Sequence, residues 1–306
     1  MAILRRRRAL AALATAIGTG LSTAAYALGI EPGFRLRVTR RALVPPNWPA
    51  GFRLTIGVIA DLHAGEPHMG PDRVRRVVAA ANALRPDLML FLGDLNASHR
   101  FLTRRLWPSE TAALLADLRA PLGTYAILGN HDWWEDDAAQ KAGRGPTAAH
   151  LALEASGIPV LENTGRRLVK DGQPFWLLGL GDQWAWWGGS VRRLHRGGVD
   201  DLPATLAAAT DAAPAIMMAH EPDIFPEVPA RVALTLAGHT HGGQARLFGW
   251  SPLTASKFGN RYAYGHVVEG GRHLMVSGGL GCSVAPIRFG VPPEILLVEL
   301  GQPGAG

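Results

Sequence analysis

The feature that most constrains the fold is a pairing, repeated along the chain, of a short apolar run with a block of polar residues. Three pairs come first: residues 54–60 before Asp61-Leu62-His63, 88–92 before Gly93-Asp94, and 124–128 before Gly129-Asn130-His131-Asp132. Short apolar runs bounded by turns indicate buried strands. Helical spacing of apolar residues over 71–84, with Pro71 in the first turn, and over about 109–118 places helices between them. The alternation predicts an α/β fold.

The second half of the chain repeats this pairing. Residues 175–180 run into Gly181-Asp182, 215–219 into His220-Glu221, and 232–237 into Gly238-His239-Thr240-His241, with further strands expected at 273–277 and 295–300. Open α/β sheets bind their ligands outside the carboxyl ends of the strands. We therefore expect the polar blocks to meet at one edge of the fold and to form a site.

The N-terminus carries a membrane-type segment. Arg5 to Arg8 precede 22 uncharged, mostly apolar residues at 9–30, which is long enough for a helix to span a bilayer. A buried core helix is disfavoured because the segment is apolar on all faces. We predict three parts: a membrane anchor or signal segment at 1–30, a connector at 31–53 and a folded domain at 54–306. A cleaved signal remains the alternative, either ending near Ala27 or of the twin-arginine type.

Charge and cysteine content exclude several classes of protein. The net charge is +6, but Arg5 to Arg8 supply four of these charges and residues 1–30 contain no acid, so only +2 remains for the rest. This balance argues against nucleic acid as a partner. Cys282 is the single cysteine, which excludes an internal disulfide and a zinc site built from several thiolates.

The polar blocks contain the side chains that bind divalent cations. Carboxylate, amide oxygen and imidazole suit Mn, Fe, Zn or Mg better than copper or a thiolate cluster. Asp61 and His63 are two residues apart, so both point to one side of an extended segment, and His239 and His241 share this spacing. Asp94 has two oxygens, with which it could bridge two metals.

In order, the blocks resemble the calcineurin-like metallophosphoesterases, whose signature is Asp-x-His, Gly-Asp, Gly-Asn-His-Asp/Glu, a lone His and Gly-His-x-His. The resemblance covers roughly residues 54–300 and implies a four-layer αββα sandwich. It also implies that Asp61, His63 and His241 hold one metal, that Asn130, His220 and His239 hold the other, and that Asp94 bridges them. His131 would face the substrate, and Asp132 could orient it or could simply cap a turn. Many relatives carry a further acid after Gly-Asp, where this chain has Leu95-Asn96-Ala97.

Other motifs narrow the resemblance to a membrane-anchored bacterial branch that acts on phosphodiesters or nucleotide-linked lipids. These are the anchor, Glu31-Pro32, the Gly-His-Thr-His-Gly-Gly-Gln stretch at 238–244 and Pro292-Pro293-Glu294. The resemblance implies a phosphodiesterase or pyrophosphohydrolase with two divalent cations, Mn being favoured, about 4 Å apart, whose bound hydroxide attacks phosphorus. His131 would stabilise the phosphoryl oxygens or protonate the leaving oxygen. The expected partners are the membrane and a phosphoester substrate, which could be linked to a lipid. No oligomeric state is predicted.

Two other functions stay open. One is a broad phosphomonoesterase for cell-envelope phosphates, and the other is a non-catalytic metal-binding scaffold, which the complete ligand set disfavours. The expected location is the bacterial inner membrane. Arg5 to Arg8 favour a cytoplasmic N-terminus and thus an outward-facing domain, although four arginines between residues 35 and 41 balance the charge count.

Several further residues have two interpretations. Trp133, Trp134, Trp184, Trp186 and Trp187 are either core residues or an apolar rim that touches a lipid. Asp182 either lines the substrate cleft or caps a loop. Glu221 and Asp223 are expected to be loop residues. Six histidines are expected to have surface or packing roles: His68, His99, His150, His195, His266 and His273.

Overall fold

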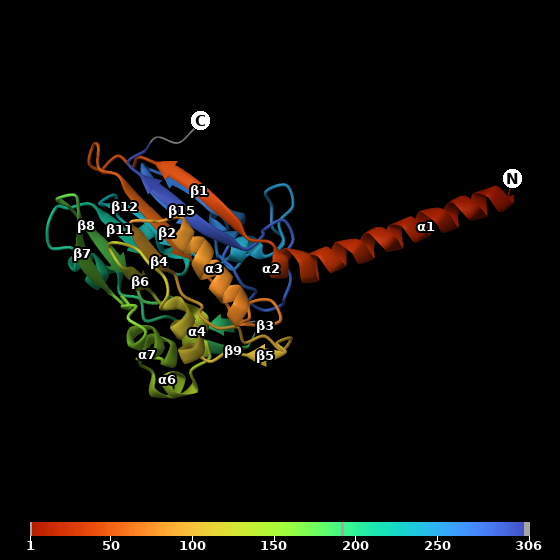
Figure 1. Ribbon diagram of the computed structural model, residues 1–306, viewed down its shortest axis with the longest axis horizontal. Helices are drawn as coiled ribbons and strands as arrows, with labels where there is room; N and C mark the ends of the chain where they lie inside the picture. Colours follow the sequence, from red (N-terminus) through yellow and green to blue (C-terminus); the bar gives the residue numbers. More distant parts are fainter. Residues whose placement is uncertain (1, 191–192, 303–306) are drawn as a thin grey trace.

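A computed structural model describes residues 2–190 and 193–302, and its N-terminal helix stands away from the body of the molecule (Figure 1). Helix α1 (Ala2–Ala25) continues through a π-helical turn, η1 (Tyr26–Ile30), into the short α2 (Glu31–Phe34). Among the described residues, one helix, Arg5–Phe34, is long and apolar enough to cross a membrane. Leu10, Leu13, Ile17 and Leu21 on it are all exposed. The body therefore does not bury the apolar surface of this helix.

The body contains two large sheets. The first has five strands in the order β1-β15-β2-β4-β6, and the second has six in the order β13-β14-β12-β11-β8-β7. The strands of the first are β1 (Arg37–Leu43), β2 (Leu54–Ile59), β4 (Leu88–Phe91), β6 (Thr124–Ala126) and β15 (Glu294–Leu300). Those of the second are β7 (Thr164–Lys170), β8 (Gln173–Gly179), β11 (Ala215–Met218), β12 (Val232–Ala237), β13 (Gly265–Glu269) and β14 (Arg272–Val276).

The predicted alternation accounts for the central strands of both sheets. β2, β4 and β6 are parallel to one another, as are β8, β11, β12 and β14. Antiparallel strands complete the sheets: β15 beside β2, β7 at one edge of the second sheet and β13 at the other. The parallel strands read as continuous apolar runs because both of their faces are covered.

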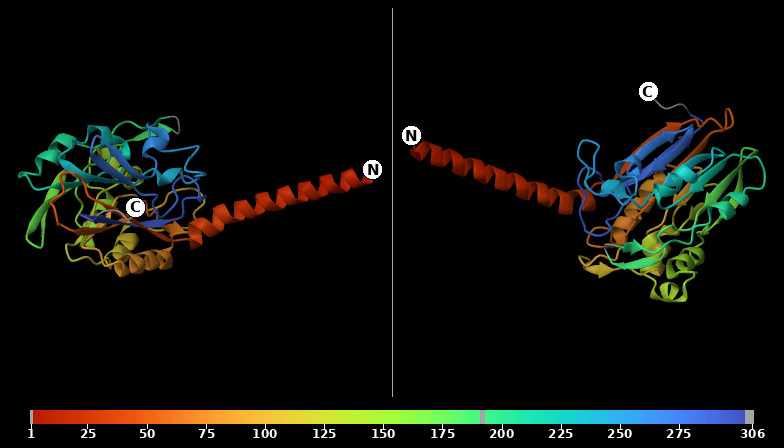
Figure 2. Two further views of the ribbon diagram at one scale, coloured as in Figure 1. Left: turned by 90° about the horizontal axis from the view of Figure 1, so that it is seen from above. Right: turned by 180° about the vertical axis from the view of Figure 1, so that it is seen from behind.

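The two sheets pack face to face, and helices cover their outer faces (Figure 2). Ile56, Leu90, Leu177 and Leu234 belong to the core between the sheets. Helices α3 (Pro71–Ala83), α4 (Pro108–Leu115) and α7 (Ala148–Ala155) cover the first sheet, and α8 (Leu202–Ala207) with the 3-10 helix η2 (Pro222–Glu227) covers the second. The prediction of a four-layer αββα sandwich preceded by an apolar helix is confirmed.

Helix α3 illustrates why these segments are helical. Pro71 occupies the first turn, where its missing N–H costs nothing. Val74, Val77, Val78 and Ala81 recur at helical spacing and are all buried against the first sheet. Burying each valine contributes about 1.5–3 kcal/mol, so the apolar stripe stabilises the docked helix.

Residues 31–53, expected as a connector, contribute a strand to the first sheet. β1 pairs in parallel with β15, from Arg37 beside Glu294 to Leu43 beside Leu300. Trp48 and Phe52 then stack with their ring centroids 5.0 Å apart and pack on Phe175 of β8. The arginines on β1 hid the strand from the sequence pattern, because this edge strand is mostly exposed.

Shorter elements occur in the connections between these strands and helices. They are β3 (Gly65–Glu66), β5 (Arg104–Arg105), α5 (Asn130–Trp134), α6 (Asp137–Ala142), β9 (Trp187–Ser190), β10 (Arg193–His195), η3 (His241–Gly243) and η4 (Gly259–Tyr262).

Candidate metal centre

The seven expected metal ligands come together from five loops, each at the carboxyl end of a different strand. Their relative exposures range from 0% for Asp61 to 7% for His239, so all seven are buried. The loops follow β2, β4 and β6 of the first sheet and β11 and β12 of the second. Both sheets therefore contribute to one site, as the positions of the polar blocks predicted.

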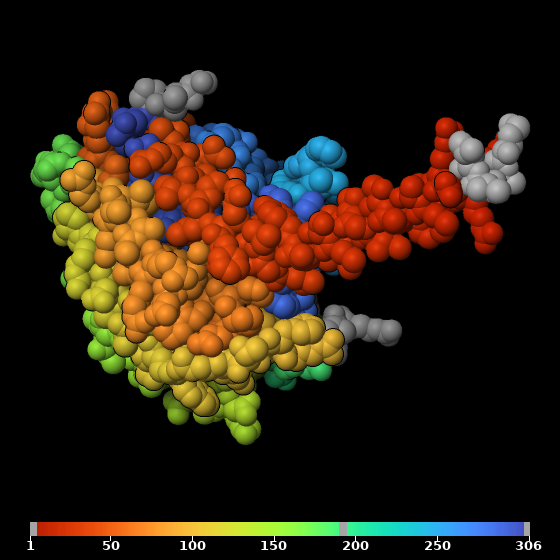
Figure 3. Space-filling view, turned by 45° about the vertical axis from the view of Figure 1, so that its right-hand side comes forward, coloured from red at the N-terminus to blue at the C-terminus, as the bar shows by residue number. Residues whose placement is uncertain are grey.

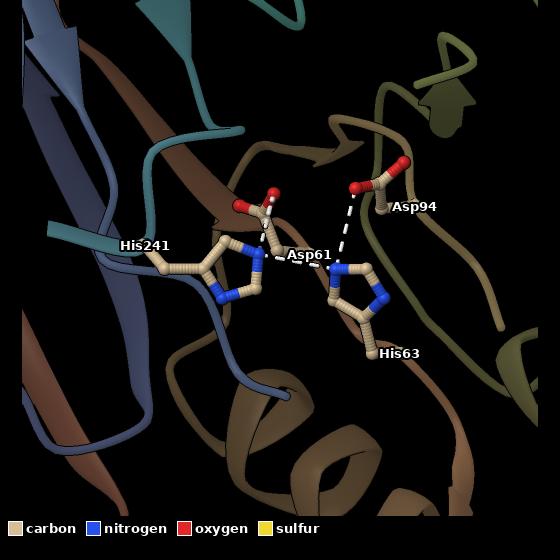
Figure 4. A group of neighbouring side chains, drawn as sticks. All are labelled: Asp61, His63, Asp94 and His241. Atoms are coloured by element: carbon tan, nitrogen blue, oxygen red, sulfur yellow. Dashed lines mark hydrogen bonds and ion pairs between the residues drawn. The ribbon is translucent and has the colours of Figure 1, made fainter. Parts of the chain in front are cut away.

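The first cluster consists of Asp61, His63, Asp94 and His241 (Figure 4). One ligand atom from each lies within 4.8 Å of the others. Nε2 of His63 is 3.2 Å from Oδ2 of Asp94, and Nε2 of His241 is 3.5 Å from Oδ1 of Asp61. The two Nε2 atoms are 3.1 Å apart. Two imidazole nitrogens and two carboxylates thus converge on one point.

The second cluster consists of His220, His239 and Asn130, with Glu221 beside them. Oδ1 of Asn130 is 2.9 Å from Nδ1 of His239. Nε2 of His220 is 3.4 Å from Oδ2 of Asp94, the same oxygen that faces His63. Asp94 therefore stands between the two clusters, which is the position of a bridging ligand.

The backbone at the site is strained. Five of the seven residues have left-handed φ values, between 41° and 66°: Asp61, His63, Asp94, His239 and His241. This conformation costs about 1–2 kcal/mol for each residue that is not glycine. Backbone bonds between the loops hold it, including Asp61 N–H to Gly93 O at 3.1 Å and His63 N–H to Asp94 O at 3.0 Å. Strain of this kind is typical of functional sites.

Gly129 leaves room for the ligands. A Cβ on this residue would lie 2.5 Å from Oδ1 of Asp94 and 2.5 Å from Cε1 of His220. No side chain fits there without moving both ligands, which explains why glycine precedes Asn130.

The side chains of the site fit two divalent cations. Oδ2 of Asp61, Nε2 of His220 and Nε2 of His239 are buried and have no hydrogen-bond partner in the described part of the chain. An unpaired buried polar atom costs about 1–3 kcal/mol, so several in one place require an electrophile. A cation at each cluster would satisfy them, and the N and O ligands match borderline or hard metals.

The histidines of the site are held in different charge states. Burial lowers the pKa of His63, and it lowers the pKa of His239 and His241 further, so these three rings are neutral and keep a lone pair for a metal. Burial also acts against the charged form of His220, but Asp94 raises the pKa of this histidine well above its ordinary value.

The two central carboxylates differ as well. Burial opposes the ionisation of Asp94, but the charges of His220 and His131 hold its pKa well below the ordinary range. Burial raises the pKa of Asp61 to about 7, although His220 acts in the other direction. Asp94 is thus the more strongly ionised of the two, which suits a shared ligand.

His131 lies at the rim of the site and outside both clusters. Its Nε2 is 3.1 Å from Oγ of Ser283 and its Nδ1 is 3.3 Å from Oγ of Ser98. Glu135, one helical turn on, is 3.9 Å from Nδ1. Burial acts to lower the pKa of His131, but Asp94 and Glu135 outweigh it and raise that pKa. The raised pKa favours the protonated form of this ring beside the cluster.

Of the two roles that the sequence left open for Asp132, the hydrogen bonds fit the capping role. Its Oδ2 accepts hydrogen bonds from the N–H groups of Gly129 and Asp94, and its Oδ1 accepts one from Leu95, each at 2.9 Å. Asp132 therefore ties the loop that carries Asp94 to the loop that carries Asn130. Three backbone donors surround its carboxylate. The ring of His131 instead meets the two serines, Glu135 and the rings of His63 and Trp134, whose centroids are 5.0 and 5.2 Å away.

Arg288 is a site residue that sequence reasoning missed. It is fully buried and donates hydrogen bonds to the carbonyls of Gly278, Gly281 and Val291. Its Nη2 lies 3.3 Å from Nδ1 of His241. After burial and His63, the charge of Arg288 helps to lower the pKa of His241. No sequence motif marks it, whereas the i, i+4 spacing of His131 and Glu135 could have revealed that pair.

Glu221 and Asp182 are more than loop residues. Both are about 1% exposed, and burial followed by their mutual repulsion raises the pKa of Asp182 well above its ordinary value. Oε1 of Glu221 lies 3.9 Å from Nδ1 of His239. Asp182 also caps its loop, because its Oδ1 accepts a hydrogen bond from Trp184 N–H at 2.9 Å. Asp223, by contrast, accepts bonds from Ser256 and Lys257 in loop contacts.

The tryptophans pack mainly against one another. Trp133 is buried with its ring centroid 5.2 Å from that of Trp186, and Trp134 meets Trp187 at 4.7 Å. Trp184 differs because its ring contacts that of His239 edge to face, with centroids 4.6 Å apart. Trp184 thus lies against a metal ligand, and Trp134 lies against His131 at the rim, with ring centroids 5.2 Å apart. His68 and His99 line a small pocket beside His63.

Comparison with known proteins agrees with this geometry. Residues 54–243 match the calcineurin-like phosphoesterase family. The uncharacterized metallophosphoesterase YkuE of Bacillus subtilis is 28% identical and covers 96% of this chain and 97% of its own length. The phosphodiesterase YaeI of Escherichia coli is 29% identical and covers 97% of this chain and 100% of its own length.

A third relative has a lipid substrate in its name. The UDP-2,3-diacylglucosamine pyrophosphatase LpxG of Chlamydia trachomatis is 28% identical and covers 94% of this chain and 96% of its own length. From the family match across most of the body, this chain belongs to the calcineurin-like phosphoesterase family and is a phosphoester hydrolase.

Proposed function

We propose that this enzyme hydrolyses a phosphodiester or pyrophosphate bond in a membrane-associated, lipid-linked substrate with the help of two divalent cations, Mn being favoured. The observation that carries the proposal is the position of Asp94, whose Oδ2 faces His63 at 3.2 Å and His220 at 3.4 Å. One carboxylate shared by two histidine clusters is the arrangement that a two-metal phosphoesterase requires.

We assign Asp61, His63 and His241 to one cation, and Asn130, His220 and His239 to the other. Two such cations, when bound, would neutralise phosphate charge and lower the pKa of a water to about 7. To bind a cation, a histidine ligand must be neutral and a carboxylate ligand must be ionised. Burial keeps His63, His239 and His241 neutral, because it lowers their pKa values.

His131 is the proposed catalytic residue. It is placed beside the clusters by its backbone N–H, which donates to Oδ1 of Asp94 at 2.9 Å. Ser98 and Ser283 contact opposite ring nitrogens and so limit rotation of the ring. With its pKa raised, the imidazolium can donate a hydrogen bond to a phosphoryl oxygen or a proton to the leaving oxygen.

Membrane association supports a lipid-linked substrate. A helix able to span a bilayer enters the body at α2, and Pro32 of α2 lines the pocket beside His63. LpxG is named for a diacylated nucleotide sugar, and a relative from Danio rerio, 29% identical over 82% of this chain, is named as a transmembrane protein. The zebrafish protein is longer, and this chain covers 54% of it.

We further propose that residues 1–30 remain attached as an anchor to the bacterial inner membrane. Ala27, beside the alternative cleavage point, is 5% exposed and its carbonyl accepts a hydrogen bond from Arg288 N–H at 2.9 Å. Cleavage there would cut within a continuous helix whose C-terminal end contacts the body at Tyr26 and Ala27. In this proposal 54–306 is the phosphoesterase domain, 31–53 completes its first sheet, and the domain faces outward.

A substrate panel tests the function. The full chain, purified in detergent and loaded with Mn²⁺, would be offered p-nitrophenyl phosphate, bis-p-nitrophenyl phosphate and UDP-2,3-diacylglucosamine in mixed micelles. We expect the highest kcat/KM on the lipid-linked pyrophosphate and turnover of the diester above that of the monoester. A preference for the monoester would instead make the enzyme a phosphomonoesterase. Bound metal without any turnover would indicate a scaffold.

A further inference from the structure

An apolar turn projects from the body shortly after the metal ligand His241. Leu247, Phe248, Trp250 and Leu253 have relative exposures of 55%, 98%, 59% and 79%. Leu247 and Trp250 exchange backbone hydrogen bonds of 2.9 and 3.0 Å, which closes a two-residue hairpin around Phe248 and Gly249. This apolar turn, residues 247–253, has the composition of an interaction surface.

Phe248 is an unfavourable choice for its place in the hairpin. Its φ is 50° and that of Gly249 is 80°, the conformation of a type I′ turn, which favours Asn, Asp or Gly at both positions. A bulky residue is strained at positive φ, and at 98% exposure it gains no packing in return. Folding does not account for Phe248, whereas contact with an apolar partner does.

The apolar turn stands beside the base of the anchor helix. Arg246 N–H donates to Phe289 O at 2.7 Å, and Phe289 N–H donates to Gln244 O at 2.9 Å. The ring of Phe289 in turn meets that of Tyr26 in the anchor, with centroids 6.3 Å apart. Figure 3 shows the light-blue lobe that contains the turn next to the red base of α1. Val284, 82% exposed, adds apolar surface on the adjoining loop.

Charge around the apolar turn suits a lipid surface. Arg246 directly precedes the turn and Lys257 follows it by four residues, whereas Arg261 is neutralised by Glu269 at 2.7 Å. Aromatic side chains with nearby cations are typical of the membrane–water interface, where the rings lie at headgroup level and the cations face anionic lipids.

We propose that the apolar turn is a second membrane contact, which inserts Phe248, Trp250 and Leu253 into the bilayer that the anchor crosses. This inference rests on the proposed anchoring. The turn is only a few residues from His241. Gln244 and Arg246, just before the turn, are bonded to Phe289, and the loop before Phe289 carries the Ser283 that contacts His131. Docking of the turn therefore holds the metal centre against the headgroup layer, where phosphates of lipids lie.

The first test measures depth in the membrane. The full chain would be reconstituted in vesicles of phosphatidylethanolamine and phosphatidylglycerol (3:1), with a nitrobenzoxadiazole label on F248C or, as control, on V169C. Val169 lies on β7, away from the anchor, and is 50% exposed (Figure 1). Cys282 is buried. Wild type treated with the same reagent shows whether this cysteine takes up any label. We expect a blue shift and at least twofold quenching by doxyl-lipid at position 248 only.

The outcomes separate docking from anchoring. Protein that floats with the vesicles but shows equal, weak quenching at positions 248 and 169 overturns the docking and leaves the anchor standing. Wild type that does not float overturns both. Loss of an oligomer in the F248G/W250S/L253S variant in detergent, with no quenching at 248, assigns the turn to a second copy of the chain and also overturns the proposal.

The second test uses activity. F248G/W250S/L253S should keep kcat/KM on bis-p-nitrophenyl phosphate within twofold of wild type and lose at least tenfold on a phosphodiester lipid embedded in the same vesicles. The control variant L151S/V169S changes two exposed apolar residues on α7 and β7 and should leave both activities unchanged. Equal losses on both substrates in the turn variant would give the turn a structural role and contradict docking.

Discussion

Asp132→Ala tests how the site is held together. Asp132 is 6% exposed, and its carboxylate accepts three backbone hydrogen bonds of 2.9 Å, from Gly129, Asp94 and Leu95. Alanine leaves all three buried donors unpaired. Each costs about 1–3 kcal/mol, and rotation of the loops toward water recovers part of this, so we expect a loss of about 3–4 kcal/mol in the free energy of unfolding.

The loss should be accompanied by a change in the metal centre. Asp94 and Asn130 belong to the two loops that Asp132 joins, so the variant should bind metal more weakly at both clusters. Asp136→Ala is the matched control, because Asp136 accepts two backbone bonds, from Ala139 and Ala148, as the N-cap of α6. It should lose about 0.5–2 kcal/mol and keep its metals.

The measurements are urea unfolding of the full chain in detergent micelles, followed by circular dichroism, and metal analysis after gel filtration. Asp132→Asn should give an intermediate loss. The one side-chain oxygen of asparagine can accept two of the three hydrogen bonds, and its NH₂ group would face the third N–H donor. An Asp132→Ala variant within about 1 kcal/mol of wild type, with unchanged metal content, would refute the organising role of this residue.

Three further predictions concern the site. His131→Ala should keep both metals and lose about 10²- to 10⁴-fold in kcat on the diester, and a loss of metal would instead make His131 a ligand. Glu135→Gln removes a charge that raises the pKa of His131. Because activity that needs the imidazolium falls as pH rises through that pKa, the alkaline limb of the kcat/KM profile should move to lower pH. An unmoved limb would show that Glu135 does not control the protonation of His131. Gly129→Ala places a Cβ 2.5 Å from an oxygen of Asp94 and should lower metal content while the protein stays folded, a result that full metal loading would contradict.

Much of the fold could be predicted from the sequence because its strands are buried on both faces. Continuous apolar runs such as 54–60 and 232–237 became β2 and β12, and the polar blocks that follow them were brought to one rim. The two-residue spacings of Asp61 with His63 and of His239 with His241 were informative for the same reason, since each pair follows a strand directly.

Other parts could not be predicted because their roles depend on partners distant in the sequence. β1 is an exposed edge strand whose pattern is polar, and its place is fixed only by pairing with β15. Arg288 and Ser283 reach the site from a loop whose sequence shows no motif. Two roles stayed open for Asp132, because the sequence cannot show that three backbone N–H groups would surround its carboxylate.

The central claim is that Asp94 joins two metal sites into one centre. Metal stoichiometry of the full chain and of Asp94→Ala, measured after loading with Mn²⁺ and gel filtration, tests it most directly. We expect two ions per chain in the wild type and one or fewer in the variant, with the variant still folded by circular dichroism. Two ions per chain in both proteins would contradict the bridging role.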